Sequence, residues 1–142
     1  MNDRSRPPVS IFLADDHQLV RQGLALLLEQ AGFAIGGEAD GAEAMLAHPG
    51  LASAQVVVLD LTLGPASGLE LIPTLCRRGL RVVVYSMHEE AAVVRRALAA
   101  GASGYVTKSD AAQSLVEAIH AVLSGATYIS PRAATLHAHC SP

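Results

Sequence analysis

Residues 56–60 read VVVLD, a run of four apolar residues that ends at a carboxylate. A short continuous run rich in valine is typical of a strand covered on both faces, as in a parallel sheet. Three other apolar runs also end at polar or charged residues, namely 9–14 at Asp15-Asp16, 82–85 at Ser86 and 104–107 at Lys108. The carboxyl ends of parallel strands meet at the edge where open α/β sheets bind ligands. The sequence therefore predicts a site at that edge.

Helical patterns alternate with these runs along the chain. A weaker run, 33–39, is interrupted by Gly36 and Gly37, which indicates an edge strand. Asp40 and Asp110 are predicted N-caps of two helices. The predicted helices cover 17–31, 41–48, 67–77, 89–100 and 110–124. Five strand-helix units predict an α/β domain with right-handed crossovers and helices on both faces of a parallel sheet.

The 142 residues fit one domain, and a hydrophobic content of 51% is enough for a core without disulfides or metals. A net charge of -3 is not the basic footprint of a nucleic-acid-binding domain. Residues 1–10 lack the apolar core of a signal peptide, no apolar stretch is long enough to span a membrane, and two distant cysteines fit a reducing compartment, so we expect a cytoplasmic location. We expect a flexible arm over 1–8, the domain over 9–126 and a linker or tail over 127–142.

The residues at the sheet edge suit phosphoryl chemistry. A carboxylate such as Asp60 can attack a phosphoryl group and hold it as an acyl phosphate if a cation offsets the repulsion between the two anions. Asp15 and Asp16 add hard oxygen ligands of the kind that Mg²⁺ prefers. Ser86 is expected to donate a hydrogen bond to one phosphoryl oxygen, and Lys108 to pair with another.

Lys108 is the one lysine in a chain with nine arginines, which indicates a need for a compact ammonium at this position. Taken singly, each residue also fits an ordinary structural role. Asp16 could cap a helix, Ser86 could be a turn hydroxyl, and Asp60 could be a polar strand end. These roles do not explain why all the groups stand at the same end of consecutive strands.

At these residues the chain resembles the receiver domain of bacterial two-component response regulators. The matching motifs, over about residues 9–131, are Asp15-Asp16-His17, Asp60-Leu61, Gly68-Leu69-Glu70, Ser86-Met87-His88-Glu89 and Gly104-Tyr105-Val106-Thr107-Lys108. Two further stretches, LVRQGL at 19–24 and GATYISP at 125–131, are similar to the NarL/FixJ (LuxR-type) subfamily in particular.

The resemblance implies a flavodoxin-like (βα)5 fold with strand order 2-1-3-4-5. It implies that Asp60 is the phosphorylation site and that Mg²⁺, or Mn²⁺, is held by Asp15, Asp16, Asp60 and the Thr62 backbone carbonyl. Ser86 and Tyr105 would be the switch residues. A histidine kinase would be the phosphoryl donor. The domain would not be an enzyme but a phosphoacceptor that assists its own phosphorylation and dephosphorylation.

The subfamily normally continues into a helix-turn-helix that binds DNA, and nothing after residue 129 is expected to form one. DNA binding, and with it control of transcription, would therefore depend on an output domain that this chain lacks. Apolar residues on the first and last predicted helices suggest a homodimer face, although the same residues could be core; they are Leu19, Leu26, Leu28, Val116, Val122 and Leu123. No membrane partner is expected.

One departure from the family pattern is Leu63-Gly64-Pro65, where the proline restricts the loop after Asp60. It leaves open a receiver-like interaction module that works without phosphorylation. A haloacid-dehalogenase-like phosphatase would need a second acid two residues after Asp60, where Thr62 stands. A flavodoxin-like nucleotide binder would need a phosphate loop after the first strand, and Asp15-Asp16 would repel that phosphate.

Overall fold

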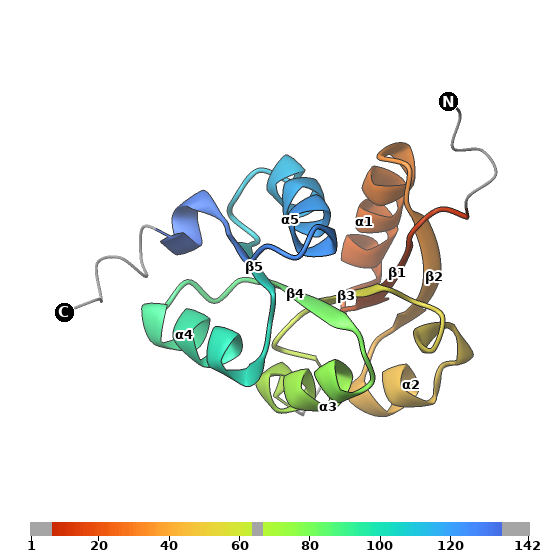
Figure 1. Cartoon of the computed structure of the whole chain (residues 1–142), viewed down its shortest axis with the longest axis horizontal. Coiled ribbons are helices and arrows are strands. Elements are labelled where there is room, and N and C mark those ends of the chain that lie inside the picture. Colours follow the sequence, from red (N-terminus) through yellow and green to blue (C-terminus); the bar gives the residue numbers. More distant parts are fainter. Residues whose placement is uncertain (1–6, 64–66, 135–142) are drawn as a thin grey trace.

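The structure, a computed structural model, describes residues 7–63 and 67–134. Its centre is a parallel sheet in the order β2-β1-β3-β4-β5-β6 (Figure 1). The strands are β1 (Ser10–Ala14), β2 (Ala34–Ala39), β3 (Val56–Leu59), β4 (Arg81–Ser86), β5 (Gly104–Thr107) and β6 (Tyr128–Ile129). The predicted order of the first five strands and the flavodoxin-like class are confirmed, and β6 is a short addition at the edge.

Helices cover both faces of the sheet, as Figure 1 shows. They are α1 (Gln18–Gln30), α2 (Ala42–Ala47), α3 (Ile72–Arg77), α4 (Ala91–Ala100) and α5 (Gln113–Leu123), with 3-10 turns η2 (Pro49–Leu51) and η3 (Gly68–Leu71). Successive residues of a strand point to opposite faces. In β3, Val56 and Val58 pack with α1 and α5, whereas Val57 and Leu59 pack with α2, α3 and α4. The continuous apolar run of β3 follows from this double burial.

The predicted N-caps are wrong. Gly41 and Ala112 cap α2 and α5. Asp110 instead accepts hydrogen bonds from the backbone nitrogen and hydroxyl of Thr107, at 3.1 and 2.7 Å. Aspartate side chains form such local turns as readily as they cap helices, and sequence alone does not separate the two. The predicted end of helix 89–100 is confirmed: α4 is capped by Gly101, whose φ of 118° favours glycine.

The segment expected to be a tail begins with β6, which pairs with β5 through Gly104↔Tyr128 and Tyr105↔Ile129. Ser130 and Ala133 beyond it are fully buried. The folded unit therefore continues past residue 126. The sequence did not predict β6, because two residues are too few to show the period of a strand. Residues 1–6 of the expected arm, the Gly64-Pro65 departure and residues 135–142 lie outside the described residues. Within 7–63 and 67–134, no helix is long and apolar enough to cross a membrane.

Candidate functional site

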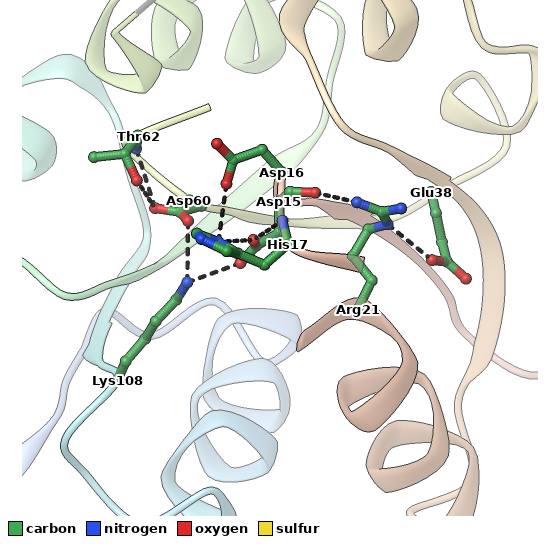
Figure 2. A network of polar contacts seen from close by, with 8 residues as sticks. All are labelled: Asp15, Asp16, His17, Arg21, Glu38, Asp60, Thr62 and Lys108. Atoms are coloured by element: carbon green, nitrogen blue, oxygen red, sulfur yellow. Dashed lines mark hydrogen bonds and ion pairs between the residues drawn. The ribbon is translucent and has the colours of Figure 1, made fainter. Parts of the chain in front are cut away.

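Three strand ends bring Asp15, Asp60 and Lys108 together at the carboxyl edge of the sheet (Figure 2). Lys108 Nζ lies 2.9 Å from Asp15 Oδ2 and 3.0 Å from Asp60 Oδ2. Their side chains are nearly buried, with exposed fractions of 11% for Lys108, 5% for Asp15 and 2% for Asp60. The structure thus brings together the central residues of the predicted site.

The ammonium of Lys108 is held in its charged form. Burial acts to lower its pKa, but hydrogen bonds with Asp15 and Asp60, and the attraction of their charges, raise the pKa above the ordinary lysine value. The Tyr85 ring lies beside it, with its centroid 5.8 Å from Nζ. Lys108 is therefore a fixed positive charge between two carboxylates, with an aromatic ring beside it.

The two oxygens of Asp60 have different partners. Oδ2 faces Lys108, whereas Oδ1 accepts hydrogen bonds from the backbone nitrogen and the hydroxyl of Thr62, both at 3.0 Å. These bonds fix the carboxylate in one orientation. The role predicted for the Thr62 carbonyl as a metal ligand stays a prediction.

Asp15 and Asp16 are joined by His17, a residue for which the sequence predicted no role. His17 Nδ1 lies 2.9 Å from Asp16 Oδ1 and 3.2 Å from Asp15 Oδ1, and its backbone nitrogen donates to Asp15 Oδ1 at 2.8 Å. Ligand atoms of Asp15, Asp16, His17 and Asp60 all lie within 4.8 Å of one another. Three carboxylates and one imidazole at this spacing suit a divalent cation.

Arg21, for which the sequence also predicted no role, supports this cluster from α1. Its guanidinium donates to the backbone carbonyl of Asp15 and binds Glu38 through Nε at 3.1 Å (Figure 2). Arg21 follows His17 by one helical turn, which places it near the start of α1. Its contact with Glu38 depends on the pairing of β1 with β2, and no local pattern reveals it.

Ser86 and Tyr105 meet at the loop after β4, beside the carboxylate cluster. The buried Ser86 hydroxyl accepts a hydrogen bond from the backbone nitrogen of His88 at 3.1 Å. The Tyr105 ring is fully buried, and its hydroxyl donates to the carbonyl of His88 at 2.8 Å. Burial outweighs the hydrogen bond with Ser86 and raises the pKa of Tyr105 to about 12. The two predicted switch residues thus both contact this loop, and the Tyr105 side chain points inward, away from solvent.

Comparisons with known proteins show what the chain is similar to. The response regulator receiver domain family matches residues 11–120. The transcriptional regulatory protein UhpA of Salmonella typhimurium is 36% identical over 125 residues, which cover 87% of this chain and 63% of UhpA. The chain therefore spans less than two thirds of the length of this relative.

Solved structures show the same likeness. A LuxR-family two-component response regulator from Aurantimonas sp. SI85-9A1 matches with a TM-score of 0.84 and 37% identity, covering 94% of this chain and 97% of that one. The isolated REC domain of RcsB from Salmonella enterica serovar Typhimurium, with the phosphomimetic BeF3-, matches with a TM-score of 0.83 and 25% identity, covering 92% and 99%. A structure of two RcsB dimers bound to two parallel DNAs matches with a TM-score of 0.84 and 25% identity, covering 93% and 69%.

Proposed function

The chain belongs to the response regulator receiver domain family, in its NarL/FixJ (LuxR-type) branch, and from this premise we propose that it takes a phosphoryl group from a histidine kinase onto Asp60. The observation that supports the proposal most is the position of the one lysine. Its ammonium lies 3.0 Å from the Asp60 carboxylate, and both groups are nearly buried. A phosphoryl group on Asp60 would have this charge beside it.

In the proposed reaction, an oxygen of Asp60 forms a bond to phosphorus while the bond from phosphorus to the donor imidazole nitrogen breaks. Lys108 pairs with one phosphoryl oxygen, and the Ser86 hydroxyl donates to another. These groups position the phosphoryl group and stabilise its negative charge, which is most of what phosphoryl transfer requires of a protein. The domain accepts the group once and releases it to water, so it is not a turnover enzyme. A cytoplasmic location remains a prediction.

The donor set fits a hard divalent cation. Asp15, Asp16 and Asp60 supply three carboxylates against the single ammonium of Lys108, which leaves negative charge uncompensated. We assign Mg²⁺, with Mn²⁺ as a substitute, to these carboxylates and to the Thr62 backbone carbonyl. When bound, the cation offsets the repulsion between Asp60 and the incoming phosphoryl group.

Removing the metal is expected to abolish phosphorylation. With Mg²⁺ and acetyl phosphate, intact-mass measurement is expected to show the addition of one phosphoryl group, and with EDTA none, because the carboxylates then repel the donor. Denatured-state controls with the same donor measure non-specific labelling. If the folded chain takes no label from acetyl phosphate or from a histidine kinase in Mg²⁺, the phosphorylation-independent interaction module becomes the better explanation.

We propose that phosphorylation controls partner or dimer affinity and, through an output domain that binds DNA, transcription. UhpA is named a transcriptional regulatory protein, and RcsB forms dimers on DNA, which supports this proposal. The predicted dimer face on α1 and α5 needs correction, since Leu28, Val116 and Val122 are buried in the core. Leu123 is partly buried against the same core, whereas Leu19 and Leu26 on α1 are 82% and 63% exposed and remain as candidates.

With beryllofluoride and Mg²⁺, we expect the chain to shift from monomer toward dimer in sedimentation velocity. Leu19→Glu and Leu26→Glu are expected to weaken that shift, since a charge on a dimer face must be desolvated. Ala44→Glu is the control, because Ala44 is exposed on α2 at the opposite face of the sheet. Dimers that form equally in all three variants would place the contact elsewhere.

A further inference from the structure

The segment after α5 returns to the sheet and covers its β5 edge (Figure 1). The backbone nitrogen of Tyr128 donates to the carbonyl of Ser103 at 3.0 Å, and that of Ser130 to the carbonyl of Tyr105 at 2.9 Å. Ala133 is fully buried and belongs to the same core cluster as Val94 and Ala97 of α4. Residues 128–134, which we call the latch, are therefore packed against β5 and the α4 side of the core.

Arg132 joins the latch to two separate loops. Its Nη2 lies 3.2 Å from Glu89 Oε1 in the loop between β4 and α4. Its backbone nitrogen donates to Asp110 Oδ1 at 3.1 Å, in the loop between β5 and α5. Ser109 of that second loop also donates to Glu89. Hydrogen bonds from Ser109 and Arg132 lower the pKa of Glu89, which keeps this carboxylate ionised.

The same two loops carry the proposed phosphoryl ligands. Ser86 lies three positions before Glu89, and Lys108 directly precedes Ser109. His88, next to Glu89, accepts the hydroxyl of the inward Tyr105 through its carbonyl. A single conformation of the β4–α4 loop therefore allows both the hydrogen bond from the inward Tyr105 and the ion pair with Arg132. Two contacts that require the same loop conformation stabilise each other.

We propose that the latch docks on the inward arrangement of Tyr105, so that phosphorylation of Asp60 and docking of residues 128–134 reinforce each other. The proposal rests on the proposed function, in which the Ser86 hydroxyl donates to a phosphoryl oxygen at the end of the loop that also holds the Tyr105 hydroxyl. Phosphorylation of the site would thus affect the residues that follow Ala134 through docking of the latch. The face formed by α4 and β5 is occupied in cis by this segment.

Hydrogen exchange of the full chain tests the proposal. Beryllofluoride with Mg²⁺ is expected to slow exchange of the Ser130 and Arg132 amides, whose acceptors are Tyr105 and Asp110. Arg132→Ala is expected to lower beryllofluoride affinity about two- to fivefold, the effect of losing one exposed ion pair, because coupling is reciprocal. Arg77→Ala is the matched control, an exposed arginine with one side-chain hydrogen bond, to Thr74.

The charge-reversed pair Glu89→Arg with Arg132→Glu is expected to restore the affinity that either single reversal lowers. If the amides around Asp60 respond to beryllofluoride but those of the latch do not, or if Arg132→Ala binds it as tightly as the parent, the latch proposal is overturned while the proposed function stands. If the amides around Asp60 do not respond either, the proposed function has failed first.

Discussion

Asp60→Asn is expected to abolish phosphorylation completely. The carboxamide keeps the size of the carboxylate and can still accept the hydrogen bonds from Thr62, but it has no anionic oxygen to attack phosphorus. The variant is expected to fold, because Lys108 keeps Asp15 as a partner at 2.9 Å and a buried negative charge is lost. Intact-mass measurement with Mg²⁺ and acetyl phosphate, or with a histidine kinase, checks this result.

Asp40→Asn is the matched control for this experiment. Asp40 also follows a strand, β2, but it is exposed and stands outside the carboxylate cluster. It is expected to be labelled like the parent chain. Undiminished labelling of Asp60→Asn would show that the acceptor is another residue, which peptide mapping would then identify.

Lys108→Arg is expected to fold and to bind Mg²⁺ but to lose the response to phosphorylation. The positive charge still pairs with Asp15 and Asp60, whereas the longer planar guanidinium does not occupy the same space beside the Tyr85 ring. The readout is the set of amide chemical-shift changes on adding beryllofluoride, which in the parent chain are expected to reach Tyr105 and the β4–α4 loop. An arginine variant that responds like the parent would show that charge alone is sufficient.

Lys108→Met tests the structural role of the ammonium apart from the role proposed for it in the response to phosphorylation. It leaves two nearly buried carboxylates facing each other without a cation, and removing one partner from a buried ion pair typically costs about 3–5 kcal/mol. Urea unfolding is expected to show this loss for Lys108→Met and a much smaller one for Lys108→Arg. Equal stability of the two variants would contradict the electrostatic role assigned to Lys108.

The sequence predicted most of what depends on strand ends. Each apolar run, such as 56–60, ends at a polar or charged residue. Once the strands are parallel, these ends lie at one edge of the sheet, and the meeting of Asp15, Asp60 and Lys108 follows. Features that depend on contacts between distant segments were missed. Neither the bond from Arg21 to Glu38 nor the pairing of Tyr128 with Gly104 leaves a periodic trace in the chain. The roles of Ser86, Tyr105 and Thr62 in switching and metal binding stay predictions.

The caps at Asp40 and Asp110 failed for a related reason. An aspartate before a helical pattern has several backbone donors within reach, and tertiary contacts decide among them. Asp110 binds Thr107 on one side and the backbone of Arg132 on the other, and the latter is 22 residues away in sequence. Asp110, which was predicted to start a helix, instead holds a segment that was predicted to be a linker or tail.

The distance along the chain between the site residues has a consequence for how the protein matures. Lys108 is 93 residues from Asp15 and 48 from Asp60, so the three groups meet only when β1, β3 and β5 have joined one sheet. Contacts of such long sequence separation form late and slow the folding of a domain. A nascent or misfolded chain carries Asp60 but has no ammonium beside it. On the proposed function, we therefore expect a histidine kinase to phosphorylate Asp60 in folded chains only, because Lys108 stands beside Asp60 only there.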